Sequence, residues 1–179
     1  MDVALLLIGI VSALAAIAAA VFALPGFMQS RRTPNLHLRP RGRVNEKDWS
    51  GQQGWHFLEF ELELHNSGKA SAKGWRVKIR TPDHPHGRVG LASRMAKGPG
   101  HDEHRMADGR RIVEWWAVEE GEAVPPRQDH PMPTGCLAQI PPGGKLVGDY
   151  MILAEGFGPK EGTIEIMYIG ANEGRVIVH

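Results

Sequence analysis

The sequence has a single cysteine in 179 residues and almost no net charge, +1 from 21 Lys or Arg and 20 Asp or Glu. One cysteine excludes a disulfide scaffold, and a hydrophobic content of 42% excludes a disordered or collagen-like chain. The small net charge argues against a dedicated nucleic-acid binder. The length suits one domain, with room for an appendage.

Known catalytic motifs are also missing. The chain contains neither a Gly-x-Ser-x-Gly elbow nor a Gly-x-x-x-x-Gly-Lys-Ser/Thr phosphate loop. Cys136 lies in a connection, where no helix N-terminus lowers its pKa, and is interpreted as a small, semi-buried hydrophobic residue. Glu119, Glu120 and Glu122 form a polar run in which nothing fixes the distance between carboxylates. We therefore predict that the protein is not an enzyme and uses no cofactor.

Residues 1–30 carry one charge, Asp2, and the run from Val3 to Leu24 has none in 22 residues. As a helix rising 1.5 Å per residue, this run would span roughly 33 Å, enough for a hydrocarbon core of about 30 Å. Its length and acidic start favour a retained transmembrane anchor over a cleaved signal peptide, although Ala18 and Ala20 offer a cleavage site. Pro25 would end the helix.

The flanks of this segment predict its orientation. Excess Lys and Arg stay on the cytoplasmic side, so the predicted topology places the N-terminus outside and the domain in the cytoplasm. The basic residues that follow the segment indicate its topology and could also bind anionic lipid. Small residues repeat every four positions in the segment, which leaves open a homo-oligomer through the helix, although an alanine-rich run shows such stripes by chance. The membrane-proximal basic residues are Arg31, Arg32, Arg39, Arg41 and Arg43.

Beyond this region the pattern changes to a period of two, which is typical of strands with one wet face. Leucine and phenylalanine alternate with glutamate from Leu58 to Leu64, and Trp75, Val77 and Ile79 alternate with basic residues. About seven strands are predicted in total, with Gly, Pro and Asn between them and no helical period. The other strands lie at 35–39, 111–118, 145–153, 162–169 and 175–178, the last two as a hairpin.

The first two of these strands carry opposite charges and could be aligned as a direct hairpin. That register would place Glu63 opposite Arg76, Glu61 opposite Lys78 and Glu59 opposite Arg80. In a sandwich the same two strands would cross to opposite sheets. Any two alternating strands of opposite charge can be aligned in this way, so we favour the crossing.

Within residues 62–79, the sequence ELHNSGKASAKGWRVKI (63–79) resembles bacterial immunoglobulin-like domains of the CARDB kind. In those domains a strand ends in Asn-x-Gly and an alternating strand follows. The later IPPGGKLVGDYMILA is similar to the proline-glycine corner of such domains. The resemblance covers about 35 of 179 residues and implies a fold and no activity. The predicted fold is all-β, an immunoglobulin-like antiparallel β-sandwich of about seven strands behind one N-terminal transmembrane α-helix.

We predict three regions: an anchor at 1–29, a basic juxtamembrane linker with the first strand at 30–52, and the sandwich at 53–179. Residues 83–109 include five Gly, two Pro and four His, and are predicted to be a long mobile loop and a place of partner contact. Trp115 and Trp116 are adjacent, so they should point to opposite faces of a strand, and at most one belongs to the core.

The histidines are the remaining candidates for chemistry. His84, His86, His101 and His104 lie beside carboxylates and could ligate a metal, but their spacing matches no known site and a solvated loop is the preferred interpretation. The predicted function is a single-pass membrane protein whose cytoplasmic β-sandwich binds a protein partner and no nucleic acid. The alternative is an extracytoplasmic ligand- or metal-binding domain with the opposite topology.

Overall fold

The computed structural model describes residues 33–47, 54–82, 87–92, 97–119, 121–141 and 144–179. The chain divides into two compact units, residues 1–33 and 34–179, and apart from Thr33 all of the described residues belong to the second. None of the described residues forms a helix long and apolar enough to span a membrane. The segment 3–24, predicted as an anchor, lies outside the described residues, as do Arg31 and Arg32.

The described part of the second unit is all-β. Its fourteen strands are β1 (Leu36–Glu46), β2 (His56–Asn66), β3 (Ala72–Lys73), β4 (Arg76–Thr81), β5 (Arg88–Leu91), β6 (Lys97–Gly98), β7 (His101–Arg105), β8 (Arg111–Trp116), β9 (Ala123–Val124), β10 (Gln128–Pro131), β11 (Cys136–Ile140), β12 (Lys145–Ala154), β13 (Phe157–Gly170) and β14 (Glu173–Val178). The prediction of about seven strands is therefore too low.

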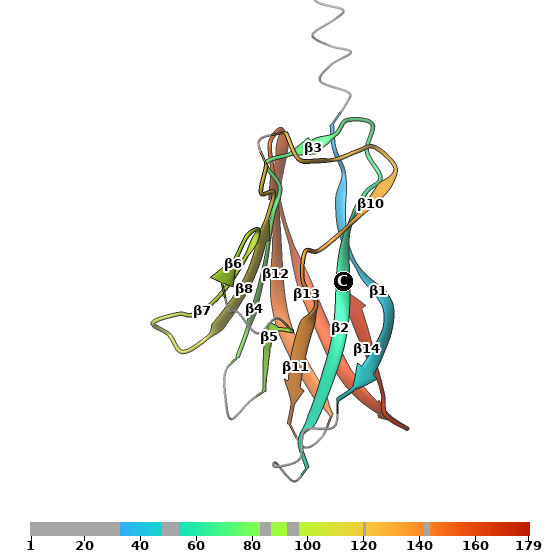
Figure 1. Cartoon of the computed structure of the whole chain (residues 1–179), viewed down its shortest axis with the longest axis vertical. Helices are drawn as coiled ribbons and strands as arrows, with labels where there is room; N and C mark the ends of the chain where they lie inside the picture. Colours follow the sequence, from blue (N-terminus) through green and yellow to red (C-terminus); the bar gives the residue numbers. More distant parts are fainter. Residues whose placement is uncertain (1–32, 48–53, 83–86, 93–96, 120, 142–143) are drawn as a thin grey trace, which may run out of the picture. The chain divides into compact units, whose positions relative to one another are not determined.

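Every strand pair is antiparallel. Twelve strands form one sheet, with the path β5-β11-β2-β1-β14-β13-β12-β4-β8-β7-β6 and β10 beside β2, while β3 and β9 form a small second sheet. The large sheet folds back on itself, so that the layer of β11, β2 and β1 faces the layer of β13, β12, β4 and β8 (Figure 1). Strand β14 joins the two layers because it pairs with both β13 and β1. The arrangement is sandwich-like.

The core lies between the two layers and follows the period-two pattern of the sequence. Leu58, Phe60, Leu62 and Leu64 point inward from β2 and are buried. Across from them lie the inward residues of the other layer. These are Val77, Ile79, Val113, Trp115, Tyr150, Ile152, Ile164 and Ile166. Burial of apolar side chains stabilises the fold by about 25 cal/mol for each Å² of apolar surface removed from water.

Strands β2 and β4 do not pair with each other, so the hairpin alternative is wrong. The two strands lie in facing layers, although both layers belong to one continuous sheet. β2 pairs with β1, β10 and β11, and β4 pairs with β8 and β12. The glutamates of β2 face cations of β1 and Lys47, the residue that follows β1, instead of those of β4. Arg41 Nη1 lies 3.7 Å from Glu61 Oε2, Lys47 Nζ lies 2.6 Å from Glu59 Oε2, and Arg39 is the cross-strand partner of Glu63.

Residues 83–109 do not form one long loop. Their described part holds β5, β6 and β7, and Val89 and Leu91 are buried in the core. The edge of β5 is satisfied by side chains of the other layer, since the Val89 amide donates to Thr81 Oγ1 (3.1 Å) and the Leu91 amide to Glu103 Oε2 (2.8 Å). Long-range pairing thus stabilises strands that carry few apolar residues. Residues 83–86 and 93–96 lie outside the description.

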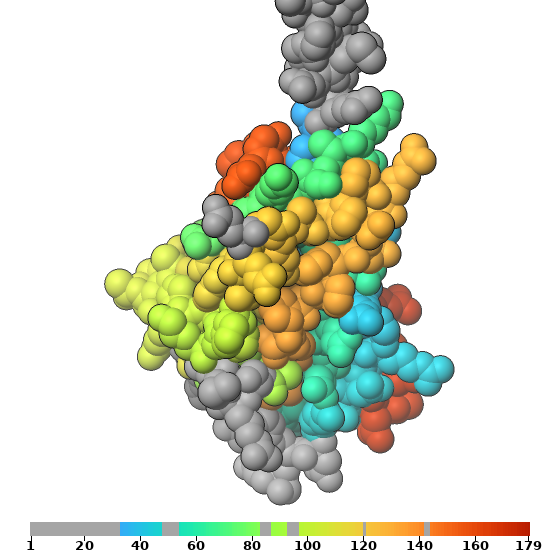
Figure 2. Space-filling model, turned by 45° about the horizontal axis from the view of Figure 1, so that its top comes forward, coloured from blue at the N-terminus to red at the C-terminus, as the bar shows by residue number. Residues whose placement is uncertain are grey.

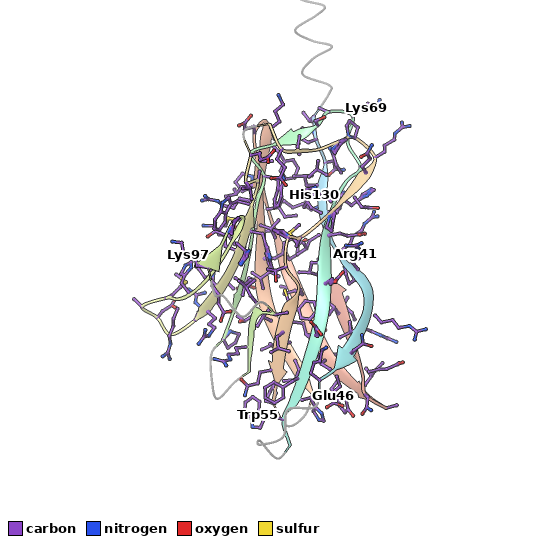
Figure 3. All side chains as sticks on the ribbon, viewed as in Figure 1. Arg41, Glu46, Trp55, Lys69, Lys97 and His130 are labelled. Atoms are coloured by element: carbon purple, nitrogen blue, oxygen red, sulfur yellow. The ribbon has the colours of Figure 1, made fainter. Side chains whose placement is uncertain are left out.

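The second unit has two ends along its strands. The proximal end holds Pro34, the turn after β2 with Lys69, and the β12–β13 turn, whose Glu155 amide donates to the Lys73 carbonyl (2.9 Å). The distal end holds Glu46 and Trp55, and Figure 3 labels residues at both ends. The first and last strands meet toward the distal end, where Figure 2 shows β1 in cyan beside β14 in red.

Candidate functional site

The candidate metal-binding histidines do not come together. His84 and His86 lie outside the described residues. His101 is buried, and its Nδ1 is hydrogen-bonded to the Pro99 carbonyl (3.1 Å), whereas His104 is exposed with Nδ1 4.0 Å from Asp102 Oδ2. Two residues three apart on a strand point to opposite faces. Among the described residues, no group of three or more His, Cys, Asp or Glu could hold a metal ion.

Arg39, Arg41 and Arg43 lie along β1, where they are exposed. Two of them face glutamates of β2, as described above. At about 3.3 Å per residue, Arg43 lies roughly 25 Å along the strand from Asn35 at the proximal end. These positions give Arg39 and Arg41 cross-strand partners within the domain, in addition to any part they play in setting the topology.

Cys136 and the acidic run have structural surroundings. The Cys136 side chain is fully buried in the core, and burial raises the pKa of its thiol far above the ordinary range. Glu122 does not join a carboxylate pair, since its Oε2 accepts the Val118 amide (2.6 Å) and its Oε1 lies 3.2 Å from His130 Nε2. Cys136 is therefore not an activated thiol, and Glu122 is bound by Val118 and His130.

Asn66, the last residue of β2, is completely buried at the proximal end. Its Oδ1 accepts the amides of Asn35 (3.1 Å) and Gly68 (3.0 Å), and its Nδ2 donates to the carbonyls of Ala70 (2.7 Å) and Val124 (2.9 Å). An amide side chain can make four hydrogen bonds, and here all four are made. One residue therefore connects the start of β1, the turn after β2, and β9.

A chain of polar side chains lies beside this network. Lys160 Nζ donates to the Leu36 carbonyl (3.0 Å) and lies 2.8 Å from His37 Nδ1, while His37 Nε2 lies 3.1 Å from Ser67 Oγ. An ammonium group only donates, so Nδ1 accepts and the Nε2 proton points to Ser67. The Ser67 hydroxyl in turn donates to the Asn35 carbonyl (3.2 Å). In this direction His37 cannot remove the Ser67 proton, which excludes a serine nucleophile in this geometry.

Charge and burial agree with that assignment. Burial, and then the positive charge of Lys160, lower the pKa of His37, which favours its neutral form. Burial also lowers the pKa of Lys160. The hydrogen bonds of Lys160, His37 and Ser67 therefore connect β13, β1 and the turn after β2, and they add rigidity to the proximal end.

Two strand edges near this end are blocked against further pairing. Because Asn35 O accepts the Ser67 amide, the ladder turns the backbone groups of residues 36, 38 and 40 away from β2. Leu36 O is bound by Lys160, and Pro40 has no N–H. On β13, His179 N donates to Thr163 O, so the backbone groups of residue 163 point to the β14 side of the strand. Residue 159 lies four positions earlier and points to the same side, where its backbone faces the open edge, and this residue is also a proline. Prolines at such positions prevent the addition of a strand.

The outer face of the β8, β4, β12 and β13 layer carries an ordered pattern of charged side chains. Register places Lys78 of β4 beside Met151 of β12 and Met151 beside Glu161 of β13. The next row, two residues along each strand, holds Arg80, Asp149 and Thr163. Cations thus follow β4 and acidic or polar side chains follow β13, with Met151 between them.

These side chains line a groove of about 350 Å³. Lys78 and Arg80 form one wall, Glu161 and Thr163 the other, and Ile112 and Met151 contribute apolar surface. Glu114 of β8 stabilises the basic wall, with its Oε1 3.0 Å from Arg76 Nε and 3.4 Å from Lys78 Nζ. Glu161 is exposed. The arrangement offers charge of both signs around an apolar centre, which suits binding to a protein surface.

Sequence reasoning missed both Asn66 and this groove. Asn66 stands in the Asn-Ser-Gly turn, a recognised turn signal, but its partners Asn35 and Val124 lie 31 and 58 positions away. The groove depends on the register between β4 and β12, which joins Lys78 to Met151. Alternation within each strand predicts which side chains face outward and cannot predict which strands are neighbours.

Comparisons with known proteins add little beyond a distant likeness of shape. No protein-family model and no curated protein matches the sequence. One similar solved structure is the cohesin module of a family 33 glycoside hydrolase from Clostridium perfringens, at 8% identity, 76% coverage of this chain, 96% of that chain, and a TM-score of 0.39. Another is the C-terminal domain of the Streptococcus agalactiae AgI/II polypeptide BspA, at 11% identity, 72% and 47% coverage, and 0.35. The chain spans about half the length of the latter.

Proposed function

We propose that this protein is a single-pass membrane protein that presents its β-sandwich-like domain on the cytoplasmic side as a protein-interaction module. The observation that carries the proposal is the uncharged run from Val3 to Leu24, followed after nine residues by the compact unit that begins at Pro34. Arg31 and Arg32 in the connecting segment support the inward orientation.

The surface of the domain supports a binding role over a catalytic one. The one serine–histidine contact described above points its proton in the wrong direction for nucleophilic attack, and the only cysteine is buried. The groove beside Met151 supplies both charge signs and apolar area on a rigid sheet. With two of the strand edges near the proximal end blocked by prolines, side chains of the outer sheet face are the surface that suits a partner.

The anchor can be tested by placing a charge in the apolar run. We expect Ile8→Arg to reduce membrane insertion, because an arginine at the centre of a transmembrane helix costs roughly 2.5–3.5 kcal/mol on insertion scales. Carbonate extraction of membranes, followed by immunoblotting, measures the retained fraction. Gln29→Arg, outside the run, is the control and should stay in the pellet. Full retention of the Ile8→Arg protein would show that this segment is not the anchor.

The topology requires an exposed thiol, which Cys136 does not provide. Ser71 lies in the exposed turn between β2 and β3, so Ser71→Cys creates a reactive site at the surface. A membrane-impermeant maleimide should label this variant only after the cells are opened. The unchanged protein is the control, since its buried thiol should stay unlabelled in the folded state. Labelling in intact cells would support the extracytoplasmic alternative.

A further inference from the structure

The groove beside Met151 is complementary to itself. In its central row, Met151 lies between Lys78 on one neighbouring strand and Glu161 on the other. Rotation by 180° about an axis parallel to β12 exchanges the two sides of this row. A second copy placed in this way brings its Lys78 opposite Glu161, its Glu161 opposite Lys78, and its Met151 onto Met151.

Other face-to-face arrangements do not fit the charges. A twofold axis that lies in the sheet plane but perpendicular to the strands would place β4 on β4, with Arg76, Lys78 and Arg80 against the same cations. With the axis parallel to β12, Asp149 is the one charged residue of these two rows that meets its own copy, and Arg80 is its cross-strand neighbour in each protomer. Closed dimers require such a self-complementary patch. The charge pattern therefore selects one axis direction.

We propose that the outer face of β4, β12 and β13 is the interface between two copies of this chain, related by a twofold axis parallel to β12. Lys78 and Glu161 form two equivalent ion pairs across it, and the two Met151 side chains meet at its centre. The inference rests on the proposed function in one respect. An axis parallel to the strands keeps both proximal ends on the same side, as two chains anchored in one membrane require, and anchoring raises their effective concentration.

A cysteine at the axis position tests the geometry in the full chain. Met151→Cys places a thiol where the two copies meet, and facing sheets pack about 10 Å apart, within reach of a bis-maleimide spanning about 8 Å. Treatment of membranes should yield a crosslinked dimer of this chain. Cys136 can remain because it is buried. Glu61→Cys, on the outer face of the opposite layer, is the control and should stay monomeric.

Charge reversal in the Met151→Cys background tests the ion pairs. Glu161→Lys should reduce crosslinking by about tenfold or more, because it places two lysines opposite each other at two symmetric positions. The double variant Lys78→Glu/Glu161→Lys should restore the dimer. Glu61→Lys makes the same change on the opposite layer and should have no effect. Thermal unfolding shows whether each variant is folded. If loss of the Lys78–Glu114 pair unfolds the double variant, the Glu161→Lys result alone decides whether the ion pairs form.

The outcomes are separate from those of the proposed function. No dimer with Met151→Cys, a dimer that is insensitive to Glu161→Lys, or capture of a different protein at position 151 would each overturn the twofold interface. A dimer held only by the transmembrane segment would show the second of these results. Failure of carbonate retention would overturn the anchor, while charge-dependent crosslinking of the extracted chain would still support the interface.

Discussion

Replacing Asn66 with alanine is expected to lower the free energy of unfolding by at least about 3 kcal/mol, since each buried polar group left unsatisfied costs about 1–3 kcal/mol. The change removes two donors and two acceptor sites at once, so the amides of Asn35 and Gly68 and the carbonyls of Ala70 and Val124 lose their partner. The Asn66 side chain is completely buried, so it makes these bonds away from bulk water.

Denaturant unfolding of the full chain, followed by tryptophan fluorescence, measures this effect. All five tryptophans lie beyond residue 48, so the signal reports on the domain and not on the apolar segment. Asn35→Ala is the matched control, because the Asn35 residue is exposed and its bond to Asn66 is made by the backbone. Similar midpoints for the two variants would show that the Asn66 side chain does not hold the proximal end together.

The adjacent tryptophans should give the second large effect. Trp115→Ala is expected to cost about 3–5 kcal/mol, the range for large aromatic side chains in cores. Trp115 is completely buried beside Val77, its cross-strand partner, whereas Trp116 is only partly buried and lies beside the exposed Arg76. Trp116→Ala should therefore cost about 1 kcal/mol or less.

The two variants differ by one position, so each is a control for the other in the same unfolding measurement. The expected order follows from the alternation of a strand, which sends adjacent side chains to opposite faces. Equal losses would mean that Trp116 also carries core packing, through cover on the outer face.

Strands with a clear alternation could be predicted from the sequence. The apolar residues of β2 and β4 repeat every second position, and the expected boundaries agree with the strands to within a few residues. The hairpin of β13 and β14 was also predicted. In each case one face is buried and the other is exposed to solvent, so the alternation of apolar and polar residues within the segment is enough to predict a strand.

The strands that were not predicted lack this alternation. β7 reads HDEHR, a segment with no aliphatic residue, and it is a strand because it pairs with β8 along its whole length. β5 depends on Thr81 and Glu103 to satisfy its edge. Such segments gain their structure from partners that are distant in sequence, so composition predicts a loop. The same reason hid the row of Lys78, Met151 and Glu161, which only the register brings together.

The position of β1 has a mechanical consequence. The chain reaches the domain at Pro34, and β1 then runs from the proximal end beside β2, with hydrogen bonds perpendicular to its length. Tension transmitted through residue 34 along β1 would load these bonds together in shear, and would not break them one at a time as peeling does. The first bonds to bear the load are those of Asn66 and Lys160, which bind Asn35 and Leu36. Under force, the lifetime of the folded domain would then depend on this polar clamp.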